Sequence, residues 1–447
     1  MALIAFMGLL KLVAIFVYVP GGWSILEPGF QFDPYVQSLV EGRGFVSCDY
    51  GACDHSSRMP GLPYFLWATS AVTSSLRSAA VIKAILLTLL VIFACRGVEK
   101  SLVAPTRLHV AFYVAVAGFI LLAPNLIKHA AVAHYEEGYL LEILAIAAVG
   151  ALTLLSGDLE RAGWNRYAAP IAAVSAAYLF KSSMIVVWAA TTAIVVYVAF
   201  AAGRKRLGSA LIVMALAAPA SWLGHNYATG HRLSPMSSYD GENMFRGWNT
   251  HTLDIYPRCS LDMLFEPIRV CEGRAIDLPN EKGRSGFDSE WAWNDDYKKR
   301  AMDWIIEHPA AALQAFGVKL YSVLLSPRLI PHTMTSGLEE KKRGALEEWI
   351  GGGWLAVGRA LELFGSGASL YLLICGDAPA RRVAIASLFL TVGYAAPYVL
   401  GFGYERHFSL FVMLASICAL FLFSHLVRLR YSRGVAPSRQ VIASGYV

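Results

Sequence analysis

Long apolar runs separated by short polar segments follow one another along the chain. Each run is close to the roughly 20 residues that a helix needs to cross the hydrocarbon core of a membrane. Its apolar residues lie on all sides of the helix, whereas a soluble helix carries one apolar stripe. Because hydrocarbon offers no partner to an unpaired backbone amide, such runs predict spanning α-helices. The clearest examples lie within residues 78–95, 108–127, 138–156, 166–180, 182–203, 207–224, 381–403 and 407–427.

Three further segments set the expected number of spans at about ten or eleven. Residues 2–20 predict a first spanning helix rather than a signal peptide, because Lys11 interrupts the run and no small-x-small cleavage site follows Pro20. Residues 353–375 predict another span. Residues 309–327 are only moderately apolar and contain Lys319, so they either span the membrane or lie in its interface or re-enter. The fold class is therefore an all-α, polytopic membrane protein.

The distribution of charge gives this bundle an expected orientation. Only 16% of the 447 residues are charged, against roughly a quarter in a soluble domain. The net charge of +6 comes from short basic clusters between apolar runs, which is the pattern of cytoplasmic loops rather than of a nucleic-acid surface. The clusters Arg381/Arg382 and Arg428/Arg430/Arg433 lie on the cytoplasmic side only if residues 309–327 do not span the membrane. The charge rule therefore favours an interfacial or re-entrant position for 309–327. The clusters are Arg96/Lys100/Arg107, Arg161/Arg166, Arg204/Lys205/Arg206, Arg381/Arg382 and Arg428/Arg430/Arg433.

The remaining polar loops divide the chain into three parts. Residues 1–223 form a transmembrane module with outer loops at 21–77 and 126–137. Residues 224–352 form a large outer loop with interfacial helices, and His308-Pro309 predicts a helix boundary within it. Residues 353–447 hold the last spanning helices and a short cytoplasmic tail. We find no internal repeat.

The seven cysteines separate into two groups. Cys95, Cys375 and Cys418 lie in apolar runs, so we predict that they are inert core residues. The other four form close pairs in the polar outer loops, which indicates two disulfides and an oxidising compartment. A zinc site is the alternative, although no Cys-x-x-Cys occurs. The pairs are Cys48/Cys53 and Cys259/Cys271.

Acidic and basic residues gather on the outer side. Asp33 precedes a proline and either caps a helix or serves as an acid or base. A carboxylate that deprotonates a hydroxyl, together with cations that neutralise a departing phosphate, fits group transfer from a lipid phosphate. The other outer candidates are His134, Glu136 and Glu137 at a helix start, and the cations Arg58, Lys181, Arg406 and His407.

Several segments in these loops carry motifs in a characteristic order. They are Asp33-Pro-Tyr35 with Leu39 and Gly42-x-Gly44-Phe45, Arg58-Met-Pro60-Gly-Leu-Pro63, Glu136/Glu137 with Tyr139, Tyr178-Leu-Phe-Lys181, Gly241-Glu-Asn243-Met-Phe-Arg-Gly247, Glu290–Ala301 and Tyr404-Glu-Arg406. Together they cover most of the chain. They resemble the GT-C superfamily of polyprenyl-phosphate-sugar-dependent membrane glycosyltransferases, in particular the protein mannosyltransferase and aminoarabinose transferase type. Three departures leave the acceptor open: a lone Asp33, an expected Cys48–Cys53 disulfide loop that is not a general family feature, and no large carboxy-terminal soluble domain.

The resemblance implies a GT-C-type helical bundle and an inverting sugar transfer. Asp33 would be the general base, and Glu136 or Glu137 would orient the acceptor or bind a cation. Lys181, Arg406 and Arg58 would bind the donor phosphate. No metal ligand is assigned, although the carboxylate pair and His134 suit a divalent cation. Substrate-binding candidates are Tyr35, His55, His134, His332 and Tyr404.

The implied partners are a polyprenyl-phosphate-linked sugar, a lipid, glycan or protein acceptor, and membrane lipids, without nucleic acid. Trp248 and Asn249 lie in an outer loop where a sugar could contact them. We predict that Trp291 and Trp293 instead anchor the protein at the membrane interface. The expected location is a bacterial inner (plasma) membrane with the site facing the periplasm, although an endoplasmic reticulum membrane satisfies the same physics. The alternatives are a glycan polymerase or ligase, a non-catalytic scaffold, and a transporter or flippase. The last often shows repeats and intramembrane charge, and neither is evident in the sequence.

Overall fold

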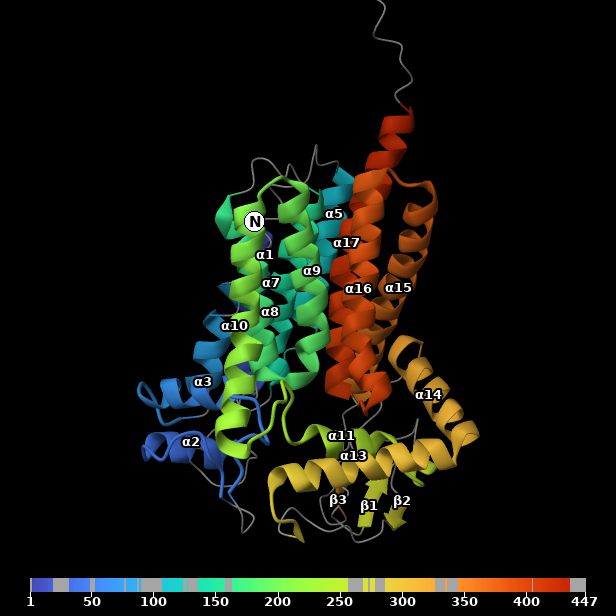
Figure 1. Cartoon of the computed structure of the whole chain (residues 1–447). Coiled ribbons are helices and arrows are strands. Elements are labelled where there is room, and N and C mark those ends of the chain that lie inside the picture. Colours follow the sequence, from blue (N-terminus) through green and yellow to red (C-terminus); the bar gives the residue numbers. More distant parts are fainter. Residues whose placement is uncertain are drawn as a thin grey trace, which may run out of the picture.

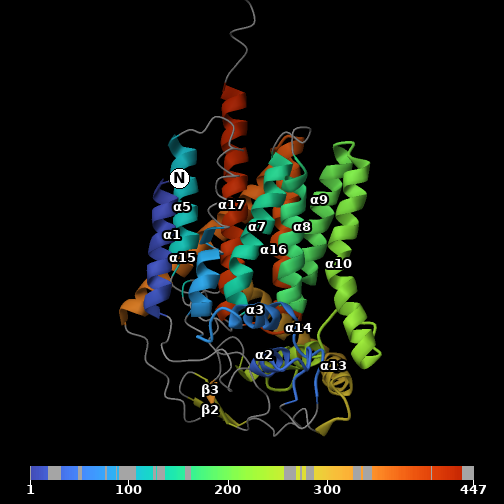
Figure 2. The same cartoon turned by 90° about the vertical axis from the view of Figure 1, so that its left-hand side faces the viewer.

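Long helices stand side by side, and further helices and a small sheet lie across one end of them (Figures 1 and 2). The computed structural model describes residues 2–18, 32–48, 53–75, 78–86, 88–89, 107–123, 127, 136–156, 163–255, 268–271, 274–277, 286–325, 334–335, 345–403 and 405–434.

The bundle confirms an all-α, multi-pass membrane protein. Within the described residues, six segments are long and apolar enough to cross a membrane: Glu137–Ser156, Ser182–Ala201, Lys205–Gly230, Gly352–Cys375, Ala378–Leu400 and His407–Arg430. Three shorter helices of 16 or 17 residues run alongside them. The bundle helices are α1 (Ala2–Tyr18), α5 (Arg107–Leu122), α7 (Glu137–Ser156), α8 (Trp164–Phe180), α9 (Ile185–Ala201), α10 (Lys205–Gly230), α15 (Ala345–Cys375), α16 (Ala378–Leu400) and α17 (Glu405–Gly434).

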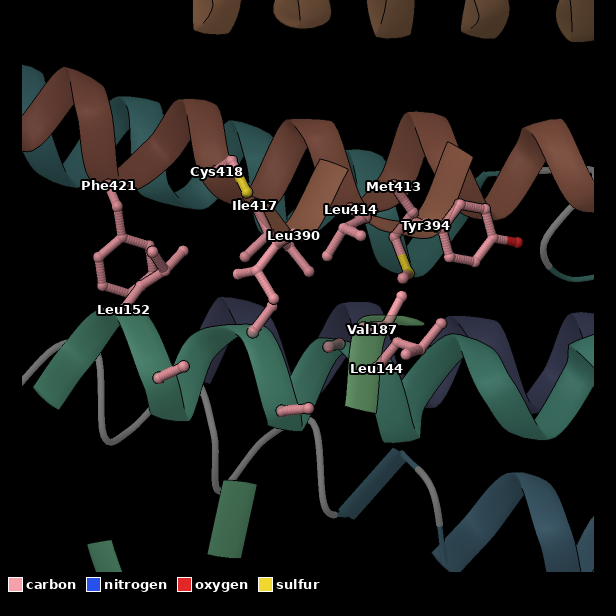
Figure 3. Packing of buried hydrophobic residues seen from close by; sticks show 14 of the residues in the cluster. Leu144, Leu152, Val187, Leu390, Tyr394, Met413, Leu414, Ile417, Cys418 and Phe421 are labelled. Atoms are coloured by element: carbon pink, nitrogen blue, oxygen red, sulfur yellow. The ribbon is translucent and has the colours of Figure 1, made fainter. Parts of the chain in front are cut away.

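The centre of the bundle is formed by α7, α16 and α17, which are apolar on all sides. Figure 3 shows Leu144 and Leu152 of α7 facing Leu414 and Phe421 of α17. Cys418 is buried in this core, as expected. Cys375 is exposed, so its prediction as a core residue is wrong: it is the last residue of α15. Peripheral helices such as α10 instead expose apolar side chains outward, as lipid-facing helices do.

The two ends of the bundle differ in chemistry. At one end, α10 begins with Lys205 and Arg206, α16 has Arg381 and Arg382 near its start, and α17 ends. We call this the basic end. The other, the cap end, carries the short helices and the sheet. α10 ends at the cap end and α15 begins there (Figure 1). Within 309–327, the described helix Pro309–Leu324 has 16 residues and is not among the six segments that are long and apolar enough to cross a membrane.

The cap has its own aromatic core. It contains α11 (Asp240–Gly247), α12 (Thr252–Ile255), α13 (Glu290–Glu307) and α14 (Pro309–Leu324), with the predicted boundary at His308-Pro309. Ser289 caps α13 through a 3.0 Å hydrogen bond from Ala292 N. Trp293 packs on Tyr239 and Tyr297 inside the cap, and Trp291 is also buried, so their prediction as membrane anchors is wrong.

A three-stranded antiparallel sheet adds to the cap in the order β2-β1-β3. Its strands are β1 (Ile268–Cys271), β2 (Arg274–Asp277) and β3 (Met334–Thr335). Val270 pairs with Ala275 on one side and with Met334 on the other. The strands have only two to four residues, too few for an alternating pattern to be visible in the sequence.

The first outer loop forms two short helices, α2 (Asp33–Val40) and α3 (Gly61–Ser70), below the bundle (Figure 2). The predicted disulfide between Cys48 and Cys53 is present beside a backbone pairing of Ser47 with Asp54. The second predicted disulfide is not tested, because Cys259 lies outside the described residues.

Removing this disulfide should cost only moderate stability. The bridge joins residues five apart, and loop-closure entropy for so short a loop is worth about 2 kcal/mol. We expect the Cys48→Ser/Cys53→Ser variant to unfold at a lower temperature than wild type in detergent. A variant as stable as the parent would show that the backbone pairing alone holds the loop.

Charged side chains also lie inside the bundle, contrary to expectation. Lys11 of α1 forms a salt bridge with Glu142 of α7, and both side chains are 1% exposed. Lys83, in a helical stretch over 78–86, places its Nζ 4.4 Å from the ring centroid of Tyr139. Since α1 and α7 are far apart in sequence, no periodicity indicated this pairing.

Candidate functional site

Asp33 lies where the first outer loop meets the bundle. It is the first residue of α2, with Phe32 as the N-cap, so the interpretation of Asp33 as a capping residue is wrong. Its side chain is buried. Phe32 packs in one apolar cluster with Tyr139 of α7 and, at its edge, Phe180 of α8. The chain neighbours of these rings include Asp33, Gly138 and Lys181, so the cluster gathers three predicted site segments.

Lys181 forms the centre of a charged cluster at the cap end of the bundle. As predicted, it lies at the tip between α8 and α9, just before a 3-10 turn over Ser182–Met184. Its Nζ lies 2.6 Å from Glu137 Oε1 and 3.4 Å from Glu136 Oε2. It also lies 3.1 Å from His407 Nε2, which is 3.2 Å from the same oxygen of Glu137. The starts of α7 and α17 and the end of α8 thus meet around one ammonium group.

His407 also belongs to this cluster. The sequence places it among the outer cations but indicates no role for it. It is buried, and the ring of Tyr398 stacks on it at 4.5 Å between centroids. The hydroxyl of Tyr394 donates to the His407 carbonyl at 3.0 Å. Its partner Glu137 is distant in sequence, so no local pattern indicated that the two side chains meet.

Arg58 belongs to a second cluster, on the cap side. Its guanidinium lies 4.1 Å from the ring centroid of Tyr239 and 5.5 Å from that of Phe32. The Tyr239 hydroxyl donates to Glu242 Oε1 at 3.0 Å and accepts from Arg246 at 2.7 Å, and Arg246 also pairs with Glu242. Burial raises the pKa of Glu242, while the neighbouring Arg246 lowers it. Arg58 therefore links the first loop to α11.

Glu290 fastens the first loop to the cap. Its carboxylate accepts from the backbone amide of His55 at 3.1 Å, from that of Ser56 at 3.0 and 3.1 Å, and from the Ser238 hydroxyl at 2.7 Å. One turn later, Asn294 Oδ1 accepts from Gly241 N at 2.8 Å. A Cβ at Gly241 would collide with the Asn294 carbonyl, so this close approach requires glycine. The start of α13 thus anchors the first outer loop through Glu290 and the start of α11 through Asn294.

The substrate-binding candidates that the structure describes have structural partners. Tyr35 shares a 2.7 Å hydrogen bond with Ser57 and stacks on Phe45 at 4.5 Å. Burial raises the pKa of its phenol well above the usual range, so this hydroxyl stays neutral. The carbonyl of His55 accepts from His225 Nε2 at 2.8 Å. Trp248 is buried against the α16–α17 turn, where its Nε1 donates to the Leu400 carbonyl, so its face is not open to a sugar.

Asp240 joins the cap to the bundle beside Lys181. Its Oδ1 accepts from the Ser182 hydroxyl at 3.0 Å. Burial raises the pKa of Asp240 to about 6, although hydrogen bonds from Ser182 and Ser237 oppose the shift. A raised pKa in the folded protein means that the folded state binds more protons than the unfolded state between pH 4 and 6.

Stability should therefore fall as the pH rises through about 6 in the wild type. The Asp240→Asn variant keeps an acceptor for Ser182 but loses the titration. We expect its melting temperature to drop less than that of wild type between pH 4.5 and 7.5. Parallel pH profiles for the two proteins would rule out Asp240 as the titrating group.

Apart from the second predicted cysteine pair, four predicted site residues remain without a described side chain. His134, His332 and Tyr404 lie outside the described residues, and Arg406 lies within α17 with only its backbone described. Among the side chains that are described, no group of three or more histidine, cysteine, aspartate or glutamate residues is placed to hold a metal ion. No family model, curated protein or solved structure matches this chain.

Proposed function

We propose that this protein is an integral-membrane glycosyltransferase that uses a polyprenyl-phosphate sugar as donor. Transfer takes place at the cap end, with inversion at the anomeric carbon. The positive-inside rule makes the basic end cytoplasmic, so the cap end faces the periplasm of a bacterial inner membrane. The sugar and the acceptor, whether lipid, glycan or protein, are left open.

One observation carries the proposal: the apolar cluster around Phe32, Tyr139 and Phe180 joins the segments that carry the buried Asp33 and the charged cluster of Lys181 at the cap end of the bundle. Asp33 adjoins the first ring, and Lys181 adjoins the last. A donor anchored in the bilayer would present its phosphate at this level. The order of the motifs that resemble GT-C enzymes supports the same assignment.

The chemistry follows from these positions. Asp33 takes the proton of the acceptor hydroxyl while the acceptor oxygen bonds to the anomeric carbon. At the same time, the bond from that carbon to the phosphate oxygen breaks. The electron pair leaves with polyprenyl phosphate, whose growing negative charge is neutralised by Lys181, Arg58 and Arg406. A planar guanidinium binds two phosphate oxygens, whereas a lysine is a point charge.

Lys181 already contacts two carboxylates, which constrains how a donor binds. Glu137 is buried and close to Lys181, whereas Glu136 is partly exposed and its oxygen is 3.4 Å from Nζ. Glu136 is therefore the contact that a donor phosphate replaces. Glu137 keeps Lys181 and His407 in place and remains available to orient the acceptor.

The test uses purified protein in nanodiscs with a panel of polyprenyl-phosphate sugars and a membrane-lipid or glycan extract. Release of polyprenyl phosphate by wild type but not by Asp33→Asn supports the transferase and locates its base. Release by both proteins keeps the enzyme but removes Asp33 from the role.

A transporter or flippase of lipid-linked sugars is the second candidate. It is favoured by the buried charges Lys11, Glu142 and Lys83, because ionisable residues inside a membrane often mark a transport path. In proteoliposomes, such a protein would move the donor between leaflets without releasing phosphate. Donor binding without any phosphate release over the whole panel would favour this alternative.

A further inference from the structure

The helix α14 has its apolar and charged sides reversed relative to a helix that faces water. Leu313 is 73% exposed, and Phe316, Leu320, Tyr321 and Leu325 are exposed with it. Its one charged residue, Lys319, is 1% exposed and lies over the ring of Trp248 at 3.5 Å. A helix at a water interface turns its charges outward and its apolar stripe inward. Water is therefore not the expected surroundings of this face.

The preceding helix shows the contrast within the same cap. The exposed side of α13 carries charged residues through its length, and only near its end do Met302 and Ile306 join it. The exposed side of α14 carries no charge at all. The change occurs at His308-Pro309, where one helix ends and the next begins. This boundary has the character of a passage from water into lipid.

The far end of α14 is held by a residue from inside a candidate span. Arg359 of α15 donates to the carbonyl of Ser322 at 3.2 Å and to that of Val323, and its charge is balanced by Glu362 at 2.6 Å. The last carbonyls of any helix lack partners within the helix. Such groups are costly in hydrocarbon. A buried arginine directed at them indicates that this end lies at the depth of the membrane.

We infer that α14 dips into the leaflet at the cap end and that lipid acyl chains cover its exposed stripe. Sixteen residues at 1.5 Å per residue reach about 24 Å, short of the roughly 30 Å hydrocarbon core, so α14 enters without crossing. It packs on α16, whose outward side exposes Phe389, Val392 and Leu400. Its stripe thus continues the lipid-facing surface of the bundle, and Figure 1 shows α14 running obliquely just below the cap-side ends of α15 and α16.

Photocrosslinking in proteoliposomes of phosphatidylethanolamine and phosphatidylglycerol tests this inference. Benzoylphenylalanine is placed at Leu313 or Leu320 on the stripe. The matched control is Lys299 on the charged side of α13, whose side chain is 76% exposed. All three positions point outward, so the fold should tolerate the probe, and unchanged elution and melting confirm that it does. We expect phospholipid adducts at the two stripe positions and none at the control.

Two results would overturn the inference. A crosslinked dimer at Leu313 or Leu320 would show that a second copy of the chain covers the stripe. Lipid labelling at these positions no greater than at Lys299 would show that the stripe faces water. Neither result bears on sugar transfer, since phosphate release is measured separately on the unmodified protein.

Discussion

Replacement of Asp33 by asparagine is expected to lower the rate of polyprenyl-phosphate release by about 10²- to 10⁴-fold, the usual contribution of a general base. Asparagine is nearly isosteric with aspartate, so the packing of Phe32 on the bundle should survive, but an amide takes up no proton at neutral pH. The loss should therefore appear in kcat, with donor binding unchanged. Single-turnover release from a radiolabelled donor in nanodiscs measures both quantities.

The matched control for this experiment is Asp54→Asn. Asp54 lies in the same outer loop and is as deeply buried as Asp33, both side chains belonging to residues that are 6% exposed. It flanks the disulfide and pairs through its backbone with Ser47, which the substitution leaves intact. Equal losses in the two variants would mean that loop stability, rather than a proton acceptor, limits the reaction.

Breaking the Lys11–Glu142 pair should produce the largest loss of stability. Removal of one partner leaves an uncompensated charge in the bundle, at a cost of about 3–5 kcal/mol, whereas replacing both with apolar residues is often neutral. We therefore expect Lys11→Met and Glu142→Met to unfold at much lower temperatures than wild type. The Lys11→Met/Glu142→Met double variant should recover most of the difference.

The two single variants should not be equal. Lys83 lies close enough to Glu142 to interact with its charge, so Lys11→Met leaves the carboxylate with a second cation nearby. Glu142→Met instead leaves Lys11 and Lys83 without the Glu142 carboxylate, so it should be the less stable of the two variants. The control is Lys299→Met in the exposed pair with Asp303, which should leave the melting temperature nearly unchanged because exposed ion pairs contribute little to stability. A double variant as unstable as the sum of the singles would contradict this account.

Local pattern predicted the parts of the site that depend on helix ends. Lys181 stands between two apolar runs and Glu136/Glu137 stand just before another, so the sequence places all three at the same membrane surface. The structure brings them within 3.4 Å. The basic clusters favoured an interfacial or re-entrant position for 309–327, because spans must return to the side where arginine and lysine are retained.

Long-range pairing was beyond the reach of such patterns. Glu142 is one polar residue in an apolar run, and nothing local indicates that Lys11, 131 residues away, neutralises it. The role of tryptophan was equally ambiguous, since an amphipathic ring suits both a membrane interface and a small buried core. Trp293 lies in a small buried core because α11 packs directly on α13, and Glu290 and Asn294 hold this contact.

The anchoring of the first loop by Glu290 has a consequence for biosynthesis. The amide of His55 and its carboxylate acceptor are separated by 235 residues. At about 5–20 residues per second of translation, the first loop leaves the ribosome roughly 10–50 seconds before its anchor. In the proposed orientation, the segment that begins with Asp33 therefore waits on the periplasmic side until α13 has been translocated. A nascent chain arrested before Glu290 should present this loop to protease, and one arrested well beyond it should not.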